Sequence, residues 1–193
     1  MLQFLAQKCT SVLLDQGAIQ IERKAVYVYG FELFWSTTLC AVSILAVGAI
    51  FDCASLSVTF LLFFMPVRTV AGGYHASSYG RCFALTNIIA ALCVAASIYS
   101  SRAALPEILL WVLLALSFAF IWKEAPFVSR THPLKEARIL KNRKYTHTLI
   151  VIEAAALLAL KALAGTEVLY TAVITSCIVA IMIMIPKRGE RGV

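Results

Sequence analysis

A histidine and a cysteine, His75 and Cys82, lie seven residues apart in the stretch VRTVAGGYHASSYGRCF, which separates two strongly apolar runs. On one uninterrupted α-helix the two residues would be ~10.5 Å apart along the axis, at about 1.5 Å per residue. That separation is too long for a hydrogen bond of ~3 Å. A working pair therefore needs a bend between them or a helix that begins after His75. The glycines Gly72, Gly73 and Gly80 could provide such bends.

The residues around Cys82 favour the thiolate form of its side chain. Ser77 and Ser78 are candidate N-caps for a helix with Cys82 in its first turn, where the thiol would feel the positive end of the helix dipole. A nearby imidazole and the Arg81 guanidinium would act in the same direction. A Cys–His pair is the minimum needed for acyl transfer, because the histidine can take the thiol proton and later give one to the leaving amine. The spacing alone also fits incidental residues at a membrane edge.

The composition indicates that lipid is the solvent of most of the chain. Of 193 residues, 61% are hydrophobic and only 14% are charged, whereas a soluble domain is about half apolar and a quarter charged. We expect an all-α integral membrane protein with six transmembrane or re-entrant helices and no second module. The six apolar runs lie near residues 31–51, 55–70, 83–100, 105–122, 147–164 and 168–185. The second run is short and reaches Met65-Pro66, which predicts a tilt, a kink or a re-entrant path.

The N-terminal residues predict an amphipathic helix. Apolar residues recur there at helical spacing, at Leu2, Leu5, Ala6, Cys9, Val12 and Leu13. Such a helix either lies along the membrane surface or packs on the rest of the protein. We therefore divide the single membrane domain 1–193 into the amphipathic N-terminal helix, 1–28, and the transmembrane core, 29–193. The core carries the catalytic segment 67–83 and a basic loop at 123–145.

The basic residues predict the orientation in a bacterial cell membrane. With six spans, one side holds 15 Lys and Arg residues and the other holds only Arg102 and Lys161. By the positive-inside rule, both termini and the segment 67–83 should be cytoplasmic. This positive face could attract anionic lipid or an acidic partner, and it gives no reason to invoke nucleic acid. The six cysteines show no Cys-x-x-Cys pair and no zinc spacing, so neither a disulfide framework nor a metal is expected.

The central stretch also resembles a known family. The pattern R-x3-GG-x-H-A-x5-C, from Arg68 to Cys82, is similar to the centre of the accessory gene regulator B (AgrB) family, membrane peptidases of Gram-positive quorum sensing. VYGFE at 28–32 resembles the pattern before the family's first span, and APFVSRTHPLKEARILKNRKY at 125–145 resembles its cytoplasmic loop. One departure is that the basic residues of this loop are dispersed, whereas some members carry adjacent lysines. The loop residues that meet substrate therefore stay open.

The resemblance implies a cysteine endopeptidase with Cys82 as nucleophile and His75 as base. The implied substrate is an AgrD-like propeptide, which has an amphipathic helix and an acidic C-terminal tail. The enzyme would cut before the tail and hold the new carbonyl as a thioester. An internal cysteine or serine of the peptide would then attack it to form a cyclic thiolactone or lactone. A homodimer is also implied, and no cofactor is.

Other polar residues are candidates for supporting roles. Glu32 could orient His75, although an acid at the start of a span is also stabilised by the helix dipole. Asn87 is an equal candidate for polarising the site, and the amides of Gly72 and Gly73 could form an oxyanion hole. Candidate substrate-binding residues are Arg68, Arg81, Lys135, Arg138 and Lys141. Glu153 lies inside the fifth apolar run, where an acid is either functional or paired with Arg143 or Lys144.

Two other classes of protein remain open from the sequence. Six spans and an intramembrane acid also fit a small transporter or channel subunit, although no repeat or pair of matched broken helices supports it. A membrane scaffold without catalysis, which anchors a peptide or a kinase, is the other alternative.

Overall fold

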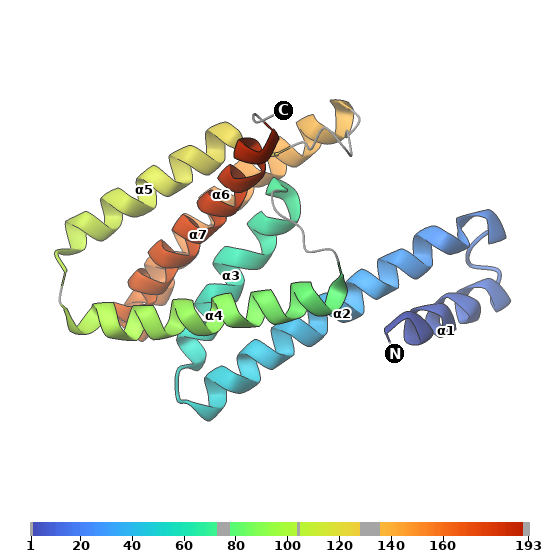
Figure 1. Ribbon diagram of the computed structural model, residues 1–193, viewed down its shortest axis with the longest axis horizontal. Coiled ribbons are helices and arrows are strands. Elements are labelled where there is room, and N and C mark those ends of the chain that lie inside the picture. Colours follow the sequence, from blue (N-terminus) through green and yellow to red (C-terminus); the bar gives the residue numbers. More distant parts are fainter. Residues whose placement is uncertain (1, 73–77, 104, 128–135, 191–193) are drawn as a thin grey trace.

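The computed structural model describes residues 2–72, 78–103, 105–127 and 136–190, and these are helical almost throughout (Figure 1). The helices are α1 (Leu2–Asp15), the short 3-10 helix η1 (Ile21–Arg23), α2 (Lys24–Ile50), α3 (Ala54–Ala71), α4 (Tyr79–Arg102), α5 (Glu107–Glu124), α6 (Glu136–Ala164) and α7 (Glu167–Glu190). No strand occurs within the described ranges. The prediction of an all-α fold is confirmed.

Five of the described helices are long and apolar enough to cross a membrane. They are η1 with α2 (Ile21–Ile50), α3, α4, α6 and the part of α7 up to Met184. The fourth predicted run is also a helix, α5, but its 18 residues carry Glu107, Lys123 and Glu124 at the two ends. These charges shorten its apolar stretch, so a sixth span remains a prediction.

The second apolar run does not break at its proline. The helix α3 continues through Pro66 to Ala71 and has 18 residues, which is near the length needed to span a bilayer. Proline removes one hydrogen bond from the helix, but neighbouring helices can hold the chain in place. Val67 and Ala71, just beyond the proline, are 1% and 0% exposed in the core. This packing explains why the helix survives.

Two helices begin well before the apolar runs that predict them, and the N-terminal helix ends well before the predicted residue 28. The helix α2 begins at Lys24, before the predicted residue 31, and α6 begins at Glu136, before residue 147. Residues 136–145 of the predicted basic loop are thus helical, because Glu, Arg and Lys are good helix formers although they are charged. The N-terminal helix α1 ends at Asp15, and Gly17 follows with a φ of 67°. The predicted unit 1–28 therefore contains a turn.

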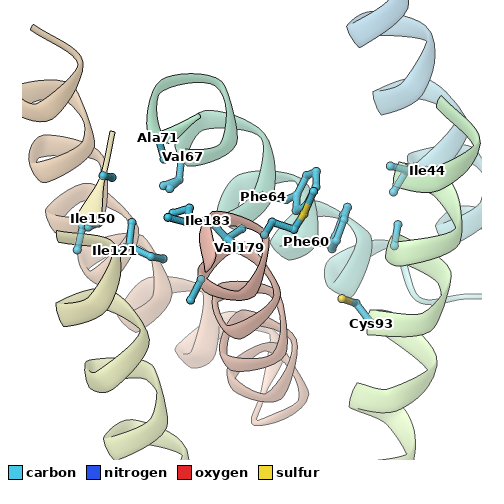
Figure 2. Packing of buried hydrophobic residues seen from close by; sticks show 14 of the residues in the cluster. Ile44, Phe60, Phe64, Val67, Ala71, Cys93, Ile121, Ile150, Val179 and Ile183 are labelled. Carbon is cyan, nitrogen blue, oxygen red and sulfur yellow. The ribbon is translucent and has the colours of Figure 1, made fainter. Parts of the chain in front are cut away.

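The helix α7 is at the centre of the bundle. It packs against α3, α4, α5 and α6, and 67% of its apolar window is buried, compared with 17% for α6. Figure 2 shows one of the two clusters of buried hydrophobic residues, in which Val179 and Ile183 of α7 meet Phe64 and Val67 of α3. This core fixes α3, whose last turn leads into the predicted catalytic segment.

The N-terminal helix α1 lies beside the first half of α2, away from α5 and α7 (Figure 1). Its contact with α2 is a narrow seam in which Ala6 and Thr10 are fully buried. Phe4, Leu5 and Val12 stay exposed. The expectation that α1 packs on the protein is thus confirmed for this seam, while its placement on a membrane surface remains a prediction.

Candidate active site

The two ends of the predicted catalytic segment are described, but its middle is not. Gly73 and His75 fall within residues 73–77, outside the described residues. Lys135 falls within residues 128–135, which are also outside them. The structure therefore gives no distance between His75 and Cys82. The site is built below from the last turn of α3, the first turn of α4 and the residues that contact them.

Cys82 lies in the first turn of α4, as the sequence predicts. Ser78 is the N-cap: its backbone is extended, its carbonyl accepts from the Cys82 N–H at 2.9 Å, and its hydroxyl accepts from the Arg81 N–H at 3.3 Å. The thiol is exposed at this helix end. Gly80, which was expected to bend the chain, lies inside this first turn instead, because α4 begins at Tyr79, directly after the Ser78 N-cap.

The last turn of α3 brings an arginine to Cys82. The Nη1 of Arg68 donates a 2.7 Å hydrogen bond to the carbonyl oxygen of Gly72. The guanidinium also lies within electrostatic range of the Cys82 sulfur. Gly72 ends α3 with a φ of 74° and a ψ of −147°, a conformation essentially restricted to glycine. The predicted break at Gly72 is confirmed, and it turns the chain from α3 toward α4.

Residues 125–127, the strap that follows α5, contact this turn, and the sequence did not predict that contact. The Phe127 N–H donates to the Ala71 carbonyl at 2.7 Å. A Cβ on Gly72 would lie 2.7 Å from the Phe127 carbonyl oxygen. The stretch after α5 thus packs backbone to backbone against the end of α3. In the sequence, only the adjacent glycines Gly72 and Gly73 indicate that another backbone segment can approach closely here.

Glu32 reaches the same helix end from α2. Its carboxylate lies within electrostatic range of the Tyr79 hydroxyl, and so does the Tyr29 side chain. Tyr79 is the first residue of α4. In the described part of the chain, Glu32 thus lies near the start of α4, while its predicted action on His75 stays untested.

Asn87 bridges α4 and α2 just beyond Cys82. Its Nδ2 donates to the Phe83 carbonyl at 2.9 Å and lies 3.6 Å from the Cys40 sulfur. Its Oδ1 accepts from the Ser43 hydroxyl at 2.8 Å. The Cys40 sulfur also lies within electrostatic range of Cys82. Ser43 and Cys40 were not predicted as site residues, because nothing in the sequence relates α2 to α4.

Comparison with known proteins places the chain in a family. The family described as accessory gene regulator B matches residues 6–185, nearly the whole chain. The chain belongs to the AgrB family. It is 28% identical over 147 residues to "Putative AgrB-like protein 2" of Clostridium perfringens (strain 13 / Type A), covering 74% of this chain and 66% of that protein. It is 27% identical over 128 residues to "Putative AgrB-like protein" of Clostridium perfringens (strain SM101 / Type A), covering 64% and 59%. The alignments thus span less than two thirds of either relative, and no solved structure matches the chain.

The basic residues of this AgrB-family chain are spread over different elements. Arg68 lies in the last turns of α3, and Arg81 lies in the first turn of α4. Arg138 and Lys141 are exposed on the first turns of α6, which packs on α3, α5 and α7, and the Lys141 ammonium lies 5.6 Å from the Tyr145 ring centre. The structure thus brings Arg68 and Arg81 to Cys82, and it records no contact of Arg138 or Lys141 with the described part of the site.

Glu153 has no ion pair with the described residues. It is 5% exposed on α6, and its Oε1 has no hydrogen-bond partner among them. The suggested pairing with Arg143 or Lys144 is therefore absent from the described part of the chain, where those two residues are exposed about two turns away. In the same ranges, no group of three His, Cys, Asp or Glu residues is arranged to hold a metal ion.

Proposed function

We propose that this AgrB-family chain is a membrane cysteine endopeptidase that cyclises its product. The Cys82 thiolate attacks the carbonyl carbon before the acidic tail of a propeptide. The peptide C–N bond breaks, His75 supplies a proton to the leaving amine, and the carbonyl stays on Cys82 as a thioester. An internal thiol of the peptide then attacks the thioester. That step forms a cyclic thiolactone and restores the Cys82 thiol.

The placement of Cys82 is the observation that carries this proposal. Cys82 is exposed in the capped first turn of α4, where a peptide carbonyl can reach it, and the Arg68 guanidinium lies within electrostatic range of its sulfur. Because this turn opens an apolar helix, the site would lie at the bilayer edge, where water activity is low. Thiol-to-thiol transfer is nearly isoenergetic, so excluding water and tethering the second thiol decide between cyclisation and hydrolysis.

The two ends of such a propeptide have counterparts in the structure. Arg68 and Arg81 can attract an acidic tail toward Cys82. A groove of about 970 Å³ between α1 and the start of α2, whose lining includes Phe4, Ile21 and Tyr29, can hold an amphipathic segment. The same proposal includes a cytoplasmic site and cytoplasmic termini in a bacterial cell membrane, and a homodimer.

Replacement of Cys82 tests this function. The chain is co-expressed with a propeptide that has an amphipathic start, a central cysteine and an acidic tail, and the cyclic product is measured by mass spectrometry. Cys82→Ala and His75→Ala should each reduce product by roughly 10³-fold or more, with the protein still in the membrane. Cys53→Ala, at the other end of α3, should leave product formation unchanged. Continued maturation by Cys82→Ala would refute the proposal.

A further inference from the structure

We propose that Asn87, together with Ser43, is a positioning residue that holds the first turn of α4, and with it Cys82, against α2. The meaning of this role for peptide processing rests on the proposed function above. The geometry behind it is the bridge between α2 and α4, which exists whatever the chain processes.

The hydrogen bonds of Asn87 leave no donor for a substrate. One amide hydrogen serves the Phe83 carbonyl, 2.9 Å away, and the other points to the Cys40 sulfur at 3.6 Å. A side-chain amide has only these two hydrogens. Asn87 also lies five residues beyond Cys82, about 7.5 Å further along the helix at 1.5 Å per residue. It therefore acts through the helix and not on the reacting atoms.

The bridge joins α2 to the turn that follows Cys82. Cys40 and Ser43 lie one turn apart on α2, and both face Asn87. The Ser43 oxygen lies 2.8 Å from both Asn87 Oδ1 and the Cys40 carbonyl, so its single proton is shared between two acceptors. On α4, Phe83 directly follows Cys82, and its carbonyl takes the Asn87 side chain in addition to the helical N–H. The position of α2 thus sets the position of this carbonyl.

The first turn of α4 is open on the face that carries Gly80 and Cys82, so contacts on its other faces, such as the bridge to α2, set its position. A Cβ on Gly80 would meet nothing within 4 Å, and Cys82 is exposed. A half-buried asparagine inside an apolar helix pair is costly unless its hydrogen bonds are made, so the bridge has few alternative arrangements. A shift of about 1 Å in a reacting atom can cost 10²-fold in rate. Fixing the turn therefore matters for chemistry at the thiol.

Two readouts in the purified full-length protein test the role. The first is the rate at which a neutral alkylating reagent modifies Cys82, measured by peptide-resolved mass spectrometry. The second is kcat and KM for the propeptide. Asn87→Ala and Ser43→Ala should each slow Cys82 modification several-fold and lower kcat about 10-fold, with KM changed less than about threefold. The double variant should be no worse than Asn87→Ala, and Ser43→Thr, which keeps the hydroxyl, should restore both values.

Ser97→Ala is the matched control, because the Ser97 hydroxyl bonds at 2.6 Å to the Cys93 carbonyl of its own helix. It should change neither readout.

If Asn87→Ala and Ser43→Ala lower thermal stability but leave Cys82 modification and kcat unchanged, the bridge is structural only and the inference is wrong. Additive effects of the two changes would also overturn it. If Cys82→Ala still processes peptide, the proposed function fails, and the modification rate alone still decides the role of Asn87. Ser43→Ala removes the hydroxyl but leaves both donor contacts of the Asn87 amide, so it keeps the test decisive if Asn87→Ala does not fold.

Discussion

Gly72 shows at the scale of one residue why the site needs a glycine. Its φ of 74° is costly for any residue with a Cβ, and that Cβ would meet the Phe127 carbonyl oxygen at 2.7 Å. We expect Gly72→Ala to lower the free energy of unfolding by about 1–3 kcal/mol. The change should also reduce product formation, because the turn from α3 toward Cys82 must shift. Thermal unfolding in detergent and the co-expression assay measure the two effects.

Gly30→Ala is the comparison for this prediction. Gly30 lies inside α2, and a Cβ there would meet nothing within 4 Å. Alanine should therefore leave stability unchanged or raise it by roughly 0.5–1 kcal/mol. A Gly72→Ala variant as stable as Gly30→Ala would show that the strap at Phe127 does not press on this turn.

Single residues were predictable where their signal is local. The Ser78 cap follows from a serine four residues before the cysteine, and the end of α3 follows from the glycine pair. Ser43 was not predictable, because its hydroxyl meets Asn87 across 44 residues of chain and only the packing of α2 on α4 brings them together. The Phe127 contact was missed for the same reason.

At the scale of helices, the apolar runs predicted which elements exist but not where two of them begin. Lipid-facing stretches are recognisable by hydropathy alone, whereas the first turns of α2 and α6 contain charged residues with high helix propensity. The helix α3 continues through Pro66, because packing at Val67 and Ala71 outweighs one lost hydrogen bond. Hydropathy carries no information about that packing.

Glu153 supplies a prediction at this scale, because it lies on the buried face of α6 between Ile150 and Leu157. A buried carboxyl oxygen without a partner among the described residues contributes little stability, and a leucine of similar size avoids the cost of burying it. We expect Glu153→Leu to leave the free energy of unfolding unchanged or raise it by about 1 kcal/mol. Unfolding of the detergent-solubilised protein by denaturant measures it.

Leu157→Ala calibrates the same assay, because Leu157 is 0% exposed one turn further along the same face. It should cost about 2–5 kcal/mol. A loss above about 2 kcal/mol for Glu153→Leu would mean that the carboxyl makes a stabilising interaction. A stable Glu153→Gln variant that no longer processes peptide would instead mark Glu153 as a functional acid.

For the whole molecule, the composition predicted lipid as solvent but not the order of the helices. The helix α7, last in the chain, is the central one, and α3 and α5 pack on it from different parts of the sequence. Hydropathy does not distinguish a helix surrounded by other helices from one surrounded by lipid. The charge bias of 15 to two nevertheless predicts which end of the bundle is cytoplasmic.

Two native cysteines test that orientation. Cys53 is half-exposed in the turn before α3, and Cys82 follows the other end of α3. The 18 residues of α3 extend about 27 Å at 1.5 Å per residue, close to the hydrocarbon thickness of ~30 Å. The two thiols should therefore lie on opposite sides of the membrane. A membrane-impermeant maleimide should modify Cys53 in right-side-out vesicles and Cys82 in inside-out vesicles, as read by peptide-resolved mass spectrometry.

Cys93, 1% exposed in the middle of α4, should stay unmodified in both preparations and so report that the protein remains folded. Modification in the reverse pattern would overturn the cytoplasmic placement of the site while leaving the spans intact. Modification of both Cys53 and Cys82 from one side would mean that α3 does not cross the bilayer. In that case Arg68 and Cys82 would not meet at the inner membrane edge, and the low water activity invoked for thioester transfer would have no structural basis.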